Sequence, residues 1–251
     1  MTATISAELL KLRTTRAPWV VGGVVVALVV AVLGLNAALL GDPGQAAFVP
    51  EVLGALARFP GRLAGGAALL LGLLLSTAEY RHRTVVTTRL AQQHPVRLVL
   101  GKAAAAAIAG VLLVVVVEAV MLAGSAILFA TRDVAFQPLH HGIPAGVGTI
   151  ALVAVLHAVA GVGIGELVRN PALAVGAVLG WTFIVEGIVP VLLREPDLNR
   201  WLPTGVVGSA LSAGLPSAAS QLAPAAGLAL LVAYAGGLLA AGLGRAQLTD
   251  P

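Results

Sequence analysis

The sequence contains no cysteine and little charge among its 251 residues. Without cysteine the chain can form no disulfide, no thiolate nucleophile and no Cys-ligated metal site. Asp, Glu, Lys and Arg make up 10% of the residues, whereas a soluble domain carries about 25%. So little charge cannot cover a surface that faces water on all sides. The composition therefore excludes a cytosolic enzyme, a secreted disulfide scaffold and a disordered chain.

Hydrophobic residues account for 59% of the chain, and the mean hydropathy is +0.99. They form long runs separated by short charged clusters, which is typical of an integral membrane protein. A helix needs about 20 apolar residues to cross the hydrocarbon core. We therefore predict an all-α polytopic fold in one transmembrane domain over 1–251, with six spans at 18–40, 63–78 (beginning as early as residue 56), 103–130, 144–164, 172–193 and 223–243.

The Lys and Arg residues predict the orientation of the chain. With the N-terminus inside, ten of the 15 fall in inner segments and five in outer ones, as the positive-inside rule requires. We therefore expect a multi-pass protein of the bacterial plasma membrane with both termini cytoplasmic, and no nucleic-acid partner. The run over 18–40 exceeds the 7–15 apolar residues of a cleaved signal peptide, so we predict that it stays as an anchor.

Two flanking segments carry weaker signals. In 1–17, Ile5, Leu9 and Leu12 recur at helical spacing, which favours an amphipathic helix on the inner leaflet. An ordinary basic flank needs no helix and explains the charges equally well. The outer segment 194–222 is too weakly apolar to cross a membrane. We predict a re-entrant segment there, which must be covered by protein because lipid cannot satisfy irregular backbone.

The segment 79–100 is the longest inner connection between predicted spans. It is basic, it is divided by Pro95, and its apolar side chains give it a footing on the membrane. A short helix presented to a cytoplasmic partner fits this composition. A positive loop that only fixes the topology fits it as well.

Glycines are dense within the predicted spans. They include the pairs Gly61 and Gly65 and Gly176 and Gly180, and the run Gly161, Gly163 and Gly165. Small residues at this spacing allow close helix approach in lipid, although compositional bias alone also produces such runs.

The sequence offers little catalytic chemistry. Gly101-Lys102-Ala103 lacks the upstream glycine and the Ser or Thr of a phosphate-binding loop, so we expect a non-catalytic chain that binds no cofactor itself. The five histidines show no spacing with carboxylates that is typical of a metal site. We expect His157 in the fourth span to make an interhelical hydrogen bond.

Glu118 and Glu186 are the two carboxylates that we predict within the membrane. At 1.5 Å per residue, Glu118 lies about 24 Å from Lys102 and Glu186 about 22 Å from Pro171, so both fall in the outer half of the bilayer. Because a charge there costs about 2.5–3.5 kcal/mol, both should face the protein interior. They either line a substrate or proton pathway or bond neighbouring helices as protonated groups.

Three segments resemble those of a known family, the permease subunits of type-2 ABC exporters, particularly actinobacterial ones. Residues 8–19 resemble the N-terminal elbow helix of that family, and the outer segment around Trp201-Leu202-Pro203 resembles its re-entrant helices. Residues 79–84, which read Glu79-Tyr80-Arg81-His82-Arg83-Thr84, resemble the cytoplasmic coupling segment of that family. Arg83 stands where the family commonly has glycine.

The resemblance implies a permease that pairs with cytoplasmic ABC ATPase subunits, which bind ATP and Mg²⁺, and with a second permease chain, identical or related. It implies that the coupling to the ATPase is carried by Glu79, Tyr80, Arg81, Arg83 and Thr84. The alternative from another class is an ATP-independent proton-coupled carrier or channel that uses Glu118 and Glu186. A membrane-embedded enzyme is disfavoured, because the spans offer no polar constellation beyond these glutamates and His157.

Overall fold

The computed structural model describes residues 1–39, 49–81, 94–131, 143–212 and 221–248. Their elements are helical throughout, which confirms the predicted all-α fold. In chain order they are α1 (Thr2–Thr14), α2 (Arg16–Leu39), α3 (Val49–Arg81), α5 (Pro95–Ala130), α6 (Ile143–Val168), α7 (Pro171–Gly180), the π-helix η2 (Trp181–Val185), α8 (Glu186–Leu192), the 3₁₀ helix η3 (Pro196–Trp201), α9 (Pro203–Ala210) and α10 (Pro224–Leu248).

Six segments in the described ranges are long and apolar enough to cross a membrane, as the sequence predicts. They are Arg16–Leu35, Phe59–Arg81, Pro95–Ala130, Gly146–Val168, Pro171–Leu192 and Pro224–Leu248. Helices α3 and α5 run beyond the predicted spans: α3 continues to Arg81, and α5 begins at Pro95. Pro95 suits the first turn of a helix, where its missing N–H has no intrahelical partner. The connection between α3 and α5 is therefore shorter than the predicted segment 79–100.

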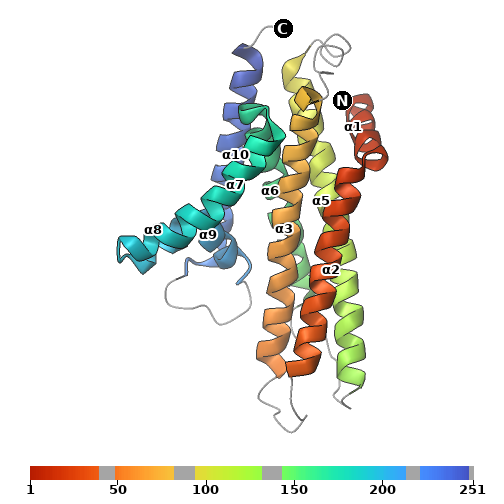
Figure 1. The fold of residues 1–251 in the computed structure, drawn as a ribbon, viewed down its shortest axis with the longest axis vertical. Coiled ribbons are helices and arrows are strands. Elements are labelled where there is room, and N and C mark those ends of the chain that lie inside the picture. Colours follow the sequence, from red (N-terminus) through yellow and green to blue (C-terminus); the bar gives the residue numbers. More distant parts are fainter. Residues whose placement is uncertain (40–48, 82–93, 132–142, 213–220, 249–251) are drawn as a thin grey trace.

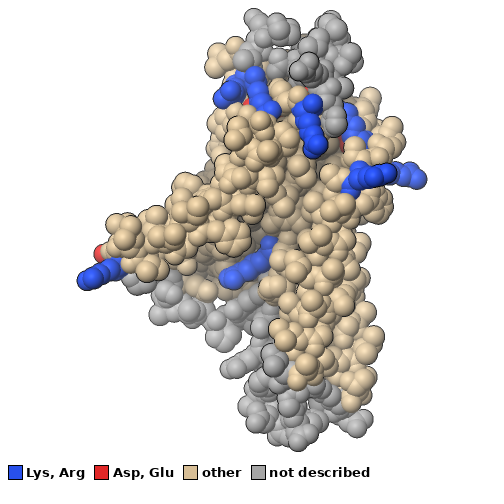
Figure 2. Space-filling view, viewed as in Figure 1, with Lys and Arg blue, Asp and Glu red and all other residues tan. Residues whose placement is uncertain are grey.

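Helices α3, α5, α6 and α10 form an elongated bundle, with α2 packed along α3 and α5 (Figure 1). The N-terminus and the C-terminal end of α10 lie at the same end of this bundle. Figure 2 shows Lys and Arg gathered around that end, whereas the long flank of the bundle is largely uncharged on the visible face. This distribution agrees with the expected positive-inside pattern, and we refer to the end with the N-terminus as the basic end.

Glycines of α6 bring the centre of the bundle into close contact. A Cβ at Gly161 would lie 2.0 Å from the carbonyl oxygen of Leu69 in α3, and one at Gly163 would lie 2.5 Å from that of Leu238 in α10. Nothing lies within 4 Å of the equivalent position at Gly176 or Gly180 in α7 and at its end. The run in α6 therefore serves helix packing, while the pair at the start of the fifth span has no packing role among the described residues.

Helix α1 confirms the expected N-terminal helix and gives its apolar stripe a partner. Leu12 is buried, and Ile5 and Leu9 pack against the core. The stripe faces α5, where a Cβ at Gly101 would lie 2.6 Å from Thr4. Unexpectedly, Glu8 lies on the same buried stripe and is only 2% exposed.

The fifth span departs from the bundle as a tilted arm made of α7, η2 and α8 (Figure 1). A sharp connection sets its start: Arg169 has a left-handed φ of 59°, and the Asn170 side chain accepts hydrogen bonds from the N–H groups of Ala172 and Leu173. At its middle, Glu186 N–H donates to the Trp181 carbonyl in a π-turn. Pro190 cannot donate to the Glu186 carbonyl. The regular helix is thus interrupted on both sides of Glu186.

The predicted re-entrant segment contains the short helices η3 and α9. Residues 206–210 of α9 are buried, and α9 packs against α10. The Tyr234 hydroxyl donates to the Trp201 carbonyl at 2.6 Å, which ties η3 to α10. Protein covers this backbone, as the expected re-entrant segment requires.

Candidate functional site

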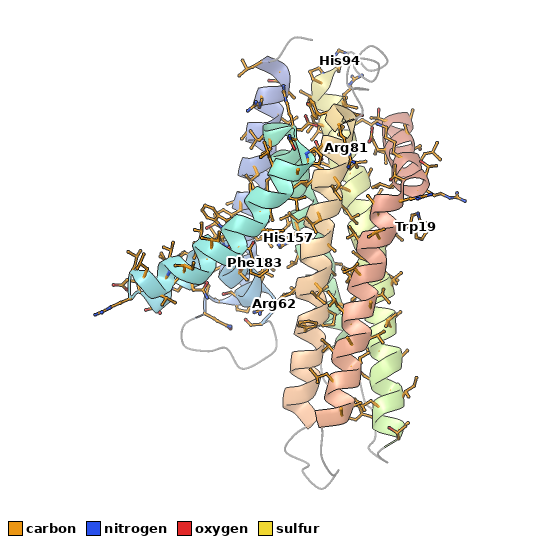
Figure 3. The ribbon with its side chains drawn as sticks, viewed as in Figure 1. Trp19, Arg62, Arg81, His94, His157 and Phe183 are labelled. Carbon is orange, nitrogen blue, oxygen red and sulfur yellow. The ribbon has the colours of Figure 1, made fainter. Side chains whose placement is uncertain are left out.

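Three of the predicted coupling residues, Glu79, Tyr80 and Arg81, lie at the basic end, where α3 ends. Glu79 is 2% exposed and Tyr80 is half-buried, so both side chains face the bundle, whereas Arg81 is exposed (Figure 3). Arg83 and Thr84 lie outside the described residues. Glu79 therefore does not present its carboxylate to a cytoplasmic partner, and its assigned role in coupling, which stays a prediction, would have to act through the chain's own helices.

Glu79 joins three helices through two lysines. Its Oε1 accepts from Lys11 Nζ of α1 at 2.7 Å, and its Oε2 forms an ion pair with Lys102 Nζ of α5 at 2.9 Å. Lys11 also donates to Glu8 Oε1 at 2.6 Å. The N-terminal helix is thereby fastened to the ends of α3 and α5.

Glu166 brings a fourth helix, α6, into this cluster. Its Oε1 accepts from Lys102 Nζ at 2.9 Å and from Ser76 Oγ at 2.6 Å. Its Oε2 accepts from the Tyr80 hydroxyl at 2.9 Å. We call Glu8, Lys11, Glu79, Lys102 and Glu166 the ion-pair cluster.

Arg169 extends the cluster towards α10. Its guanidinium lies 5.3 Å from the centre of the Tyr80 ring, within the range of a cation–π contact. It also donates to the carbonyl oxygen of Arg245 in α10 at 3.1 Å. The left-handed backbone at Arg169 that starts the arm is thus directly linked to the cluster.

The ion-pair cluster is closed to water except at Lys11, whose side chain is 39% exposed. Lys102 is 1% exposed and Glu166 is 2% exposed. A cavity between them and Glu79 has a volume of about 10 Å³, which leaves room for a single water at most. Buried ion pairs add little stability on balance, but removal of one partner leaves an uncompensated charge and is strongly destabilising. The cluster therefore favours one fixed arrangement of the four helices.

The two groups of the cluster that belong to α1 have shifted pKa values. Burial raises the pKa of Glu8 above its ordinary value, although the Lys11 ammonium opposes this shift. Burial lowers the pKa of Lys11, but the carboxylates of Glu79 and Glu8 outweigh burial and raise it overall. Lys11 is therefore a firmly charged link between α1 and α3.

Sequence reasoning missed Glu166 and predicted no ion-pair partner for Lys102. A usable signal was present, because both residues lie near the basic ends of their helices, where Glu79 also lies. A charged residue inside an apolar helix needs a partner. A comparison of the acidic and basic residues at this depth would have suggested that Glu79 and Glu166 pair with Lys102.

Glu118 and Glu186 lie in different surroundings. Glu118 of α5 is 5% exposed, and its Oε1 has no hydrogen-bond partner in the described part of the chain. Glu186 Oε2 accepts hydrogen bonds from both the N–H and the hydroxyl of Thr204. These bonds cap the first turn of α9. No hydrogen bond or ion pair among the described residues links the two glutamates, and their role in a pathway stays a prediction.

Glu186 also borders a large cavity between the arm and the bundle. The cavity has a volume of about 610 Å³ and is lined by α3, α6, α10, the arm and the start of α9 at Leu202 and Pro203. His157 lies on its wall, in the angle between the arm and the bundle, with Phe183 on the arm (Figure 3). His157 Nδ1 bonds the Val153 carbonyl of its own helix at 2.9 Å. The expected interhelical hydrogen bond of His157 is therefore wrong, because its own helix supplies the partner.

Within the described ranges, no group of three His, Asp or Glu residues is arranged to hold a metal ion. No protein-family model and no curated protein matches the sequence. The functional proposal below consequently depends on the residues and their geometry.

Proposed function

We propose that the chain is the transmembrane permease subunit of an ATP-driven ABC exporter. It would form the substrate pathway as a dimer of permease chains, with ATP and Mg²⁺ bound by separate cytoplasmic ATPase subunits. The observation that carries the proposal is the ion-pair cluster, in which α1, α3, α5 and α6 are held together at the basic end. The cluster includes Glu79, which belongs to the segment that resembles the family's coupling segment.

The cluster gives the proposed coupling a physical route. Arg81 follows Glu79 and Tyr80 at the end of α3 and is exposed. A partner that moves this end of α3 therefore also moves the Glu79 carboxylate. Lys11 and Lys102 pass that displacement to α1 and α5, because a buried charge cannot be left without its partner at low cost. Glu166 passes it to α6. A push on one short segment would thus move four helices together.

The proposal is tested by reconstituting the purified chain in proteoliposomes with and without the ATPase subunit that copurifies with it. We expect substrate transport only when the ATPase subunit and ATP are both present, and we expect substrate to stimulate ATP hydrolysis. A matched ATPase variant that binds but does not hydrolyse ATP is the control. Transport by the chain alone would overturn the proposal.

Transport by the chain alone would instead support the proton-coupled carrier or channel. In such a protein Glu118 and Glu186 would take up and release the coupling proton, and a proton gradient without nucleotide would drive transport. Replacing each glutamate by glutamine would then abolish transport while leaving assembly intact. The ABC permease needs neither carboxylate for its energy source.

The proposed orientation has its own test, because the chain has no cysteine to remove first. Single cysteines at positions 90 and 248 should be protected from a membrane-impermeant thiol reagent added outside, whereas cysteines at 137 and 198 should react. Labelling at position 90 from outside would reverse the proposed orientation and place the ion-pair cluster on the wrong side for an ATPase.

A further inference from the structure

The cavity beside the arm has the size and the lining of a binding site for a small molecule. Its volume of about 610 Å³ lies within the range of roughly 300–1,000 Å³ that is typical of ligand pockets. Most of the described lining residues are apolar, and they include the Trp181 ring. A ligand in this cavity would therefore bury an apolar body.

One carboxylate is placed at the edge of this apolar space. Oε2 of Glu186 is used by Thr204 at the start of α9. In the described part of the chain no hydrogen bond reaches Oε1, although the residue is only 7% exposed. Glu186 is thus held in place by one oxygen and retains the other for a ligand.

The remaining polar groups on the wall add no positive charge of Lys or Arg type. Among the described lining residues, His157, Thr182 and Tyr234 are the other polar side chains. The Tyr234 hydroxyl is already bonded to the Trp201 carbonyl, and His157 has its Nδ1 bonded to Val153. Among the described lining residues, no Lys or Arg therefore faces Glu186, and a bound cation would supply the missing positive charge.

We propose that the cavity beside the arm binds a lipophilic cation, with Glu186 facing the positive charge and the apolar wall around Trp181 enclosing its body. As a statement about an exported substrate, this inference rests on the proposed function. As a statement about binding, it applies to the permease chain alone. A neutral lipid tail would fill the apolar space without needing the carboxylate, and it is an outcome of the test.

The arm offers a route into the cavity from the bilayer. Phe183 and Ile184, which neighbour the lining residue Thr182, are 71% and 60% exposed, as expected of a surface that faces lipid. A molecule that partitions into the membrane therefore reaches this side of the protein without crossing a polar region. Lipophilic cations partition in this way.

The test uses tetraphenylphosphonium as the cationic probe and tetraphenylborate as an anion of the same shape. The chain has three tryptophans, so Trp19→Phe with Trp201→Phe leaves Trp181 as the only reporter. This variant is reconstituted in lipid nanodiscs without any ATPase, and binding is measured by quenching of Trp181 fluorescence. The two probes are measured in separate samples, and we expect saturable binding of tetraphenylphosphonium and no saturable binding of tetraphenylborate.

Two substitutions locate the probe. Glu186→Gln keeps an oxygen for Thr204 and removes the charge, and it should weaken binding about tenfold, as loss of one close ion-pair partner does. The matched control is Glu195→Gln, an exposed carboxylate beyond the arm, which should bind normally. Ala177→Phe fills the cavity from α7 and should weaken binding without touching the charge, whereas Ala172→Phe on the same helix should not.

Three results would overturn the inference: no saturable quenching, equal binding of the two probes, or unchanged binding in a folded Glu186→Gln variant or in Ala177→Phe. Equal binding of the two probes would show an apolar pocket for lipid tails. If Glu186→Gln does not fold, the Ala177 and Ala172 pair decides alone. Because the assay contains no ATPase, its failure leaves ATP-driven export intact, and a failure of export leaves the binding result standing.

Discussion

The basic end of the bundle and the arm are both made of apolar helices, but they are packed in opposite ways. At the basic end, three glutamates and Lys102 are buried together between four helices, and the partly exposed Lys11 pairs with two of these glutamates. The arm has one buried carboxylate, a π-turn at its middle and large apolar side chains turned outward. Tight ionic packing suits a part that transmits force, while a loosely packed arm beside a cavity suits a part that admits a ligand.

Glycine shows the same contrast. At Gly161 the backbone of α3 is so close that no side chain fits, whereas at Gly176 there is open space. Both positions read alike in the sequence, as small residues within an apolar helix. The presence of a neighbouring backbone decides what the glycine contributes, so a glycine pattern alone does not identify a helix interface.

The sharpest way to break the basic end is Glu166→Leu. This change leaves Lys102 with one carboxylate and leaves Tyr80 and Ser76 without their acceptor, and loss of one partner from a buried ion pair costs about 3–5 kcal/mol. We expect the free energy of unfolding in detergent to fall by that amount. The control, Glu195→Leu on an exposed carboxylate, should change it little. An equally small change in the free energy of unfolding of Glu166→Leu would show that the ion-pair cluster is not a structural unit.

The glycine contrast is tested by Gly161→Ala and Gly176→Ala. Overpacking typically costs about 1–3 kcal/mol, so Gly161→Ala should lower the midpoint of thermal unfolding and weaken the contact of α6 with α3. Gly176→Ala should be neutral or slightly stabilising, because alanine has the higher helix propensity. Equal effects at both sites would contradict the close packing of α3 and α6.

On the arm, Glu186→Ala removes the cap of α9 and should cost about 0.5–2 kcal/mol. Glu186→Gln should retain most of that stability, because its oxygen still accepts from Thr204. Unfolding of both variants, followed by tryptophan fluorescence, compares them directly. If both variants lose the same stability, the charge of Glu186, and not its hydrogen bond with Thr204, stabilises α9.

The smallest effect concerns the attachment of α1. Burial raises the pKa of Glu8 above 4.5, so docked α1 binds a proton more tightly than free α1. Docking is therefore favoured at low pH and weakens as the pH rises from 4.5 through the raised pKa. Spin labels at positions 6 and 97 should show a broader distance distribution at the upper end of this window. Glu8→Gln should flatten the dependence, and a narrowing with rising pH would contradict the sign.

Most of the fold could be predicted from the sequence, because length and hydropathy alone define a membrane span. Both ends of the fifth span were placed close to their positions. The splayed course of that span was not predictable, because it depends on the left-handed turn at Arg169 and the π-turn before Glu186, and neither residue type requires such a geometry.

The site was less predictable than the fold. Glu79 and Tyr80 were selected because of a resemblance that treats them as a contact for a partner, but their side chains face the bundle. Glu118 and Glu186 were paired because of similar depth along their helices, and depth carries no information about which side each helix presents. Tertiary contact between α3, α5 and α6 decides both cases.

The central claim is that the ion-pair cluster transmits the force of ATP hydrolysis to the transmembrane helices. It is tested most directly by measuring ATP hydrolysis and substrate transport together in the reconstituted complex, for the wild type and for Glu79→Gln, with Glu195→Gln, an exposed carboxylate outside the cluster, as the control. The account predicts that Glu79→Gln inserts and binds the ATPase but transports several-fold less substrate for each ATP hydrolysed. An unchanged ratio of transport to hydrolysis in Glu79→Gln would contradict it.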